Sequence, residues 1–149
     1  MYGIVNKILG VLMVLVLMIL MLCNIMVANQ LQARRSVVAE VTNFVDELTD
    51  TGTLTEKHIT DLNLAVNAYG PVCDVKIERY ARIINPDPKA PGQTYTTYAY
   101  DEDISTWNQG DLCKVTVTEA GHTGIAYFLY RVLSIVMQPI DFSFTGRIR

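Results

Sequence analysis

Residues 8–28 form a nearly unbroken apolar run, and this run limits what the chain can fold into more than any other feature. No polar side chain occurs from Ile8 to Cys23, and Asn24 is the one interruption before Asn29. As a helix, roughly 20 apolar residues cross the ~30 Å hydrocarbon core of a bilayer. Because Leu, Val, Ile and Met occupy every face, the run cannot be an ordinary amphipathic surface helix. It predicts a helix that lies in a membrane or in the core of a protein assembly.

A cleaved secretory signal peptide is the alternative for this run. Such a peptide has a basic first region, an apolar core of about 7–15 residues and a small-residue cleavage site. The run in this chain is longer, and Ala28 is not part of an A-x-A pattern. We therefore interpret the run as a functional helix whose membrane or filament-core residues include Ile8, Leu12, Leu15, Ile19, Leu22 and Met26.

The helical pattern continues after the apolar run. Apolar residues recur every three or four positions up to Leu48, and charged residues fall on the opposite side. Neither Pro nor Gly interrupts the chain between Val11 and Thr51, and Gly52 is a suitable stop signal. The sequence thus predicts one long helix in residues 1–50, with an apolar half, 4–28, and an amphipathic half, 29–49.

Residues 51–149 show the pattern of a small α+β head. Thr53 and Glu56 match a capping box at the start of a short helix, which Gly70 and Pro71 end. Alternation of apolar and polar residues then predicts the strands of an antiparallel β-sheet. The predicted fold class is therefore α+β, with strands near residues 73–78, 94–100, 112–119 and 140–145.

Two more segments of the head have a recognisable character. The apolar run from Thr123 to Met137 is long enough for a helix, although its β-branched residues leave a strand open. Pro86, Pro88 and Pro91 predict an irregular loop between residues 85 and 92.

The cysteines offer a disulfide as one of two alternatives. Cys73 and Cys113 fall on the apolar phase of two predicted strands, whereas Cys23 lies in the apolar helix and is expected to behave as a small hydrophobe. If the two strands are neighbours, Cys73 and Cys113 could pair across about 40 residues and stabilise an exported head by a few kcal/mol. Two buried free thiols are the other alternative, and a head outside the cytoplasm would favour the disulfide.

No catalytic, cofactor-binding or metal-binding pattern is recognisable in the sequence. His58 and His122 are the only histidines, and nucleophile-elbow, P-loop and dinucleotide-binding motifs are absent. The acidic residues 101–103 lack the spacing of a Ca²⁺ loop and are expected to be solvated. A net charge of −3 argues against a nucleic-acid partner. We expect a protein that is not an enzyme and has no cofactor.

Exposed arginine and aromatic side chains are the remaining candidates for a function. Tyr and Trp are favoured at protein interfaces, and Tyr95, Tyr98 and Trp107 lie close together in the sequence. With Arg34 and Arg35 they are the predicted subunit contacts. Packing of the aromatic residues in the core of the head is the alternative.

The order of these elements resembles the type IV pilin superfamily, and within it the TadE-like pseudopilins of tight-adherence pili. The resemblance rests on the helix end VANQLQARRSVVAEVTNFVDELTDTG, the following cap and helix, the turn and strand GDLCKVTVTE, and the closing DFSFTGRIR. Type IV pilins usually have Glu at the fifth mature position. This chain departs from that pattern with Val5, or with Ile8 if cleavage followed Gly3.

The resemblance implies a structural subunit of an extracellular filament. Its partners would be further copies of itself or other pilins, and its apolar helix would hold it in the cytoplasmic membrane before assembly at the cell surface. The alternative is a single-pass membrane protein that serves a secretion or conjugation apparatus. Lys7 precedes the apolar run while Arg34 and Arg35 follow it, so the positive-inside rule favours a cytoplasmic head; the pilin resemblance favours an outside one.

Overall fold

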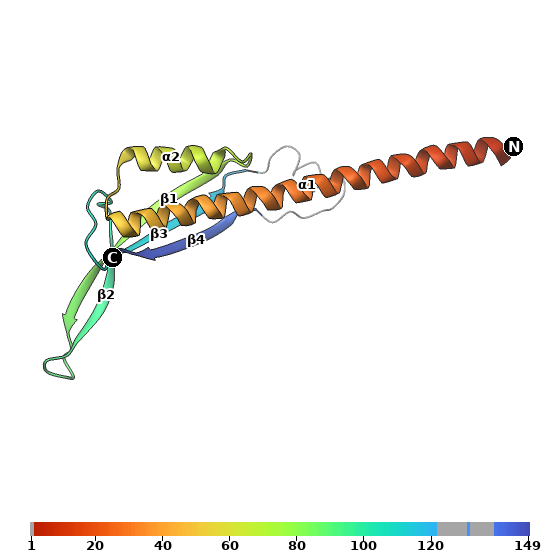
Figure 1. The fold of residues 1–149 in the computed structure, drawn as a ribbon. Coiled ribbons are helices and arrows are strands. Elements are labelled where there is room, and N and C mark those ends of the chain that lie inside the picture. Colours follow the sequence, from red (N-terminus) through yellow and green to blue (C-terminus); the bar gives the residue numbers. More distant parts are fainter. Residues whose placement is uncertain (1, 122–130, 132–138) are drawn as a thin grey trace. The chain divides into compact units, whose positions relative to one another are not determined.

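The computed structural model describes residues 2–121, 131 and 139–149. These residues form the α+β fold predicted from the sequence, a long helix followed by a short helix and a four-stranded antiparallel sheet (Figure 1). The chain divides into two compact units, residues 1–35 and residues 36–149. The elements are α1 (Tyr2–Thr51), α2 (Glu56–Asn67), β1 (Cys73–Pro86), β2 (Thr94–Asp101), β3 (Leu112–Glu119) and β4 (Asp141–Arg147).

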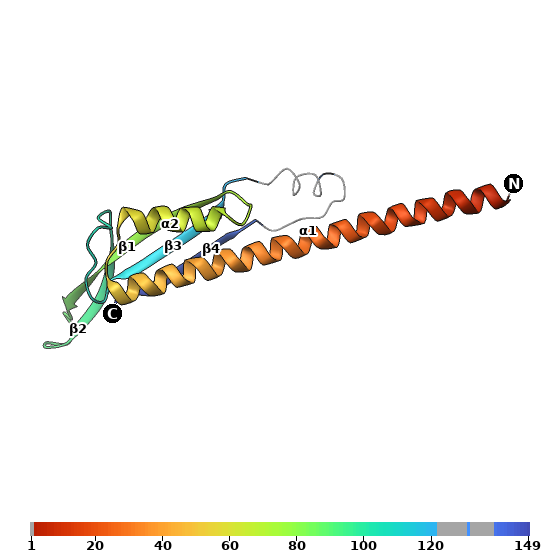
Figure 2. The ribbon, with the colours of Figure 1, turned by 45° about the horizontal axis from the view of Figure 1, so that its top comes forward.

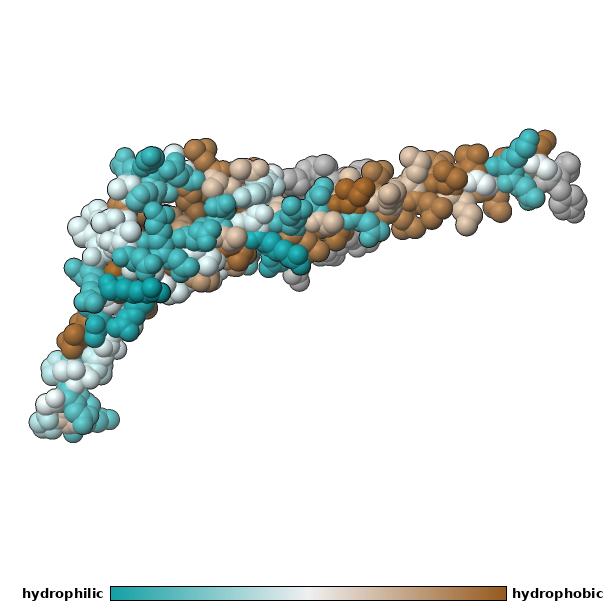
Figure 3. Space-filling model, viewed as in Figure 1, coloured by the Kyte–Doolittle hydropathy of each residue, from teal (hydrophilic) through white to brown (hydrophobic). Residues whose placement is uncertain are grey.

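The first unit consists of the apolar part of α1. Its large apolar side chains from Ile4 to Ile25 are 47–68 % exposed, and many are visible as brown atoms in Figure 3. By length and composition α1 could span a membrane. Leu31, which the periodicity places on the apolar stripe, is also exposed. A continuous apolar surface of this kind is rare on monomeric soluble proteins and marks contact with lipid or protein.

The last turns of α1 belong to the second unit. Val37, Val41 and Val45 are fully buried, and Leu48 is nearly so. The helix ends as predicted at Gly52, which adopts a left-handed φ of 63° and donates its N–H to the Leu48 carbonyl at 2.8 Å. Glycine takes this conformation without the steric cost that a Cβ would bring.

Helix α2 begins differently from the prediction. Its N-cap is Thr55, whose side-chain oxygen accepts a hydrogen bond from the His58 N–H at 3.3 Å, so the predicted capping box of Thr53 and Glu56 is wrong. Thr53 instead forms an isolated β-bridge with Thr106. The extended conformation of that bridge delays the start of the helix by two residues.

The sheet has the strand order β2-β1-β3-β4, and every pairing is antiparallel. Val115 lies opposite Ile77 on one side and Phe144 on the other. These residues belong to one core with the buried valines of α1 and with Leu62 and Val66 of α2. The second part of α1 and all of α2 therefore cover one face of the sheet (Figure 2).

Strand β1 is longer than the predicted 73–78, because it continues to Pro86, so that Asn85 and Pro86 belong to the strand and not to the predicted loop. Its residues 73–80 pair with β3, but residues 81–86 pair with β2 alone. Residues 81–86 of β1 and 94–99 of β2 thus form a two-stranded extension, which we call the β1–β2 arm (Figures 1 and 2). The helix predicted over 123–137 lies outside the described residues, apart from Arg131 in a helical turn.

Gly146 on β4 permits the closest approach between α1 and the sheet. A Cβ at this position would overlap the Val45 side chain and lie 2.7 Å from Cγ2 of Thr49. Both residues are buried on α1, so neither can move away without disturbing the core.

We expect Gly146→Ala to destabilise the second unit by about 1–3 kcal/mol through overpacking. Urea unfolding of the full chain in detergent, followed through the fluorescence of the single tryptophan, measures this loss. Gly121→Ala is the matched control, because a Cβ there meets nothing within 4 Å. Equal unfolding midpoints for the two variants would contradict the packing described above.

Candidate functional site

The predicted membrane or filament-core residues lie on the exposed surface of the first unit. Ile8, Leu12, Leu15, Ile19 and Leu22 are 48–61 % exposed, whereas Met26 is partly buried. No other element of the first unit covers them, since that unit consists of α1 alone. Within the first unit, the apolar surface of these side chains is therefore left uncovered.

The predicted subunit contacts fall into two groups. Tyr95 and Tyr98 are 48 % and 40 % exposed on β2, and Arg35 is exposed while Arg34 is partly buried. Trp107 is different, because its ring packs against the core of the second unit. Its Nε1–H donates to the Ile104 carbonyl at 2.8 Å, which leaves the indole without a free donor for a partner. The partly buried Trp107 ring thus matches the alternative of packing in the head, whereas its role as a subunit contact stays a prediction.

Of the two alternatives for Cys73 and Cys113, the structure shows the free thiols and not the disulfide. Cys73 and Cys113 lie on neighbouring strands and are buried, but both thiols are free. Cys113 pairs in register with Arg79, six residues beyond Cys73 on β1. At roughly 3.3 Å per residue the two cysteines are about 20 Å apart along the strands, far beyond disulfide reach. Their spacing in the sequence gave no information on this register.

A buried ion pair lies where β1, β2 and the start of β3 meet. Arg79 and Asp111 are 4 % and 2 % exposed, and Nη2 of Arg79 lies 2.8 Å from Oδ2 of Asp111. Arg79 also donates from Nη1 to the Asp103 carbonyl and lies 3.2 Å from the Asp101 carboxylate. The guanidinium is 5.9 Å from the centre of the Trp107 ring. One arginine therefore joins the end of β2 to the turn before β3.

Asp111 is held by several donors at once. Burial raises the pKa of its carboxyl. Hydrogen bonds from the backbone N–H groups of Arg82 and Asn108 and from the Arg79 side chain lower the pKa by more than burial raises it, so the pKa is lowered overall. The carboxylate is thus stabilised in its charged form. This network fixes the base of the β1–β2 arm and has no access to a substrate, so we interpret it as structural.

The sequence contained one signal for this network. On β1 the apolar phase of Cys73, Val75 and Ile77 leads directly to Arg79. A charge on the buried phase of a strand requires a buried partner. The sequence did not indicate which of the nearby carboxylates supplies it.

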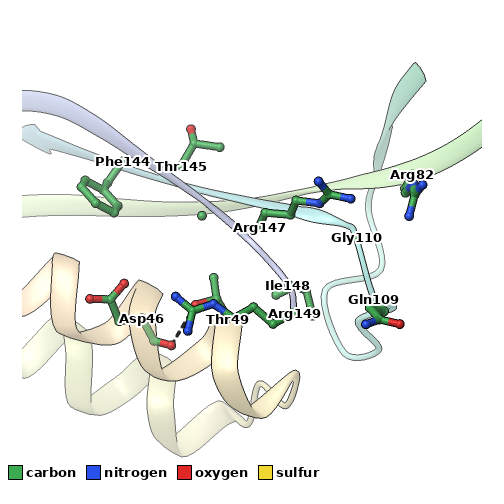
Figure 4. Close-up of a pocket in the computed structure, with 11 residues that line it drawn as sticks. Asp46, Thr49, Arg82, Gln109, Gly110, Phe144, Thr145, Arg147, Ile148 and Arg149 are labelled. Atoms are coloured by element: carbon green, nitrogen blue, oxygen red, sulfur yellow. Dashed lines mark hydrogen bonds between the residues drawn. The ribbon is translucent and has the colours of Figure 1, made fainter. Parts of the chain in front are cut away.

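A basic groove runs along β4 beside the last turns of α1 (Figure 4). It has a volume of about 700 Å³ and contains the side chains of Arg82, Arg147 and Arg149, with Asp46 as the one carboxylate among its lining residues. Arg149 lies 2.9 Å from the exposed Asp50, and its backbone N–H donates to the Thr49 carbonyl. The groove therefore carries excess positive charge.

An acidic groove of about 420 Å³ lies on the other side of the same turns, between α1 and α2. Glu40, Glu47 and Asp61 contribute carboxylates to it, and Lys57 is its one lysine or arginine. The Tyr69 hydroxyl donates to Glu40 at 2.9 Å, and this hydrogen bond is the main cause of the raised pKa of Tyr69. The second unit thus presents opposite charges on the two sides of α1.

Comparison of the chain with models of protein families, with curated proteins and with solved structures finds no match.

We expect Asp111→Asn to reduce the free energy of unfolding by about 3–5 kcal/mol, because it removes the buried carboxylate of the pair and leaves Arg79 with only the partly exposed Asp101. Asp74→Asn, at an exposed position on β1, is the control and should have little effect.

Acid titration adds a second test of the role of Asp111. Because the folded-state pKa of Asp111 is lowered, its contribution is complete above about pH 4 and is lost as the pH falls through that pKa. Below pH ~4 the wild type should lose stability more steeply than Asp111→Asn, and parallel curves would exclude this role.

We also expect three free thiols, of which Cys113 reacts only when the second unit unfolds. Burial raises the pKa of Cys113 to about 12, so almost no thiolate forms at neutral pH. Alkylation in denaturant without reductant, followed by intact-mass measurement, should add three labels, equal to the number of cysteines. A reduced sample is the control. One label before reduction and three labels after it would show that two of the cysteines form a disulfide, and would contradict this prediction.

Proposed function

We propose that this protein is a structural subunit of an extracellular filament of the type IV pilus kind, and that α1 packs against copies of itself in the filament core. One observation carries the proposal: α1 continues without a break from an exposed apolar part into a part that is built into the core of the second unit. A membrane anchor needs roughly 20 apolar residues and no such continuation.

The energetics of α1 suit an exchange between lipid and protein. Acyl chains are as apolar as leucine, so helices leave lipid for one another through better packing and not through exclusion of water. Met13, Met18 and Met21 lie on the exposed surface of α1. Their flexible side chains adapt to irregular gaps between helices. The same surface that would face lipid before assembly would face neighbouring subunits afterwards.

The charges of the second unit support contacts between copies that are related by a screw rotation. Arg147 in the basic groove and Glu47 in the acidic groove lie on different sides of α1, so a copy could present its acidic side to the basic side of the next. Such a contact joins two different surfaces and, when it does not close into a ring, produces a helical filament.

Electron microscopy of sheared cell-surface material, with mass spectrometry of the isolated fibres, tests the proposal. We expect fibres that contain this chain. If the polypeptide stays wholly in the membrane fraction and deletion of its gene does not change the fibres, the protein is a membrane-anchored accessory component instead.

A matched pair of variants separates packing from anchoring. Replacing every residue of the segment 8–26 by leucine keeps the helix long and apolar enough for a membrane but removes its specific packing shape. We expect this variant to enter the membrane and to form less than about a tenth of the wild-type fibres, because cores respond to changes of shape. Lys57→Arg, which keeps the charge of the second unit, is the control. Wild-type fibre numbers in the all-leucine variant would contradict a filament core made of α1.

A further inference from the structure

Strand β2 is an edge strand without the features that normally protect an edge. In the part of the chain that the structure describes, β2 pairs with β1 alone, and its residues from Thr94 to Tyr100 are all exposed. The strand contains no Pro, Gly or Lys, and Asp101 at its end is its only charge. Natural proteins usually place lysine, other charged residues or proline on exposed edge strands to prevent pairing with another chain. An unprotected edge of eight residues is therefore a candidate binding surface.

The β1–β2 arm has little to support it within the chain. It is two strands wide, and Ile83 and Ile84 are 42 % and 58 % exposed on its opposite faces. Isolated two-stranded hairpins are at best marginally stable in water. Within the arm the structure provides one side-chain hydrogen bond between the strands, from Nδ2 of Asn85 to Oγ1 of Thr97. A third strand would satisfy the open backbone groups of β2 and cover part of this apolar surface.

The other edge of the arm is less suited to a partner. Beside β1, the backbone N–H of Arg82 donates to Asp111, and the Arg82 side chain lies against Gly110 so closely that a Cβ there would be 2.7 Å from Cδ. Pro86 further lacks a backbone donor. The free edge of β2 is thus the open one.

We propose that β2 pairs with β2 of a second copy in an antiparallel arrangement around a two-fold axis. The charge of the strand favours a second copy in this orientation. Antiparallel pairing places the two Asp101 side chains at opposite ends, whereas parallel pairing in register would put them side by side at an energetic cost. The uncharged Thr and Tyr residues between them are favourable cross-strand partners for one another. An edge that is self-complementary in this way needs no other protein. The pairing goes beyond the proposed filament, because α1 takes no part in it.

Cysteine scanning of the full chain in detergent tests the pairing, with Cys23→Ser as the background. After mild oxidation, a two-fold antiparallel pair should give cross-linked dimers most strongly at one position near the middle of β2, with yields that fall toward both ends. Thr118→Cys is the control, because Thr118 is exposed but lies on a strand whose two edges are both paired; it shares its face of the sheet with Thr96 and Tyr98. The scan consists of Tyr95→Cys, Thr96→Cys, Thr97→Cys, Tyr98→Cys and Ala99→Cys.

Two results would overturn the proposal. Equal cross-linking along the whole strand indicates parallel pairing, and cross-linking no stronger than that of Thr118→Cys indicates that β2 does not pair with itself. Both outcomes leave the filament proposal untouched, since that proposal is tested on α1.

A charge at the edge provides an independent measurement. Thr96→Lys should raise the dissociation constant of the β2-mediated dimer at least about tenfold in sedimentation experiments, because lysine protects edges against pairing. Thr118→Lys introduces the same charge on the outward face of β3 and should leave the constant unchanged. Equal constants for the two variants would contradict the β2 contact.

Discussion

The packing of α1 on the inner face of the sheet is the contact on which the second unit depends. A row of buried valines, including Val41 and Val45, supplies one side of the core, and Val115 on β3 supplies the other. The absence of a side chain at Gly146 sets how closely the helix can lie on β4. Without this contact the apolar face of the sheet would be exposed to water.

A second constraint is the buried arginine at the base of the β1–β2 arm. Arg79 occupies a position of β1 that faces the core, where the pattern places apolar residues. Its contacts with Asp111 on one side and with Asp101 and Asp103 on the other join the turn before β3 to the end of β2. Buried ion pairs seldom add much stability, but loss of one partner is costly. The network therefore acts as a fixed junction. The arm extends beyond it, so the unprotected β2 edge is positioned by a part of the molecule that cannot easily rearrange.

The surfaces that we propose for assembly differ in physical character, and each would make a different contact available. The exposed part of α1 is apolar and suits lipid or other helices. The grooves beside α1 carry opposite charges and suit a copy related by a screw rotation, whereas the β2 edge offers backbone hydrogen bonds and suits a copy related by a two-fold axis. Under these proposals, membrane insertion, polymerisation and pairing of copies would depend on separate residues and could be altered separately.

Local patterns in the sequence determined the long helix, its end at Gly52 and the existence of all four strands, because a period of 3.6 or 2 is a property of neighbouring residues. The partner of Arg79, the separation of Cys73 from Cys113 and the packing of Trp107 against the core were decided only by the tertiary structure. Each depends on strand register or on the approach of distant segments, which one sequence does not encode locally. The N-cap at Thr55 belongs to the same group, since a bridge to Thr106 displaced it from the predicted position.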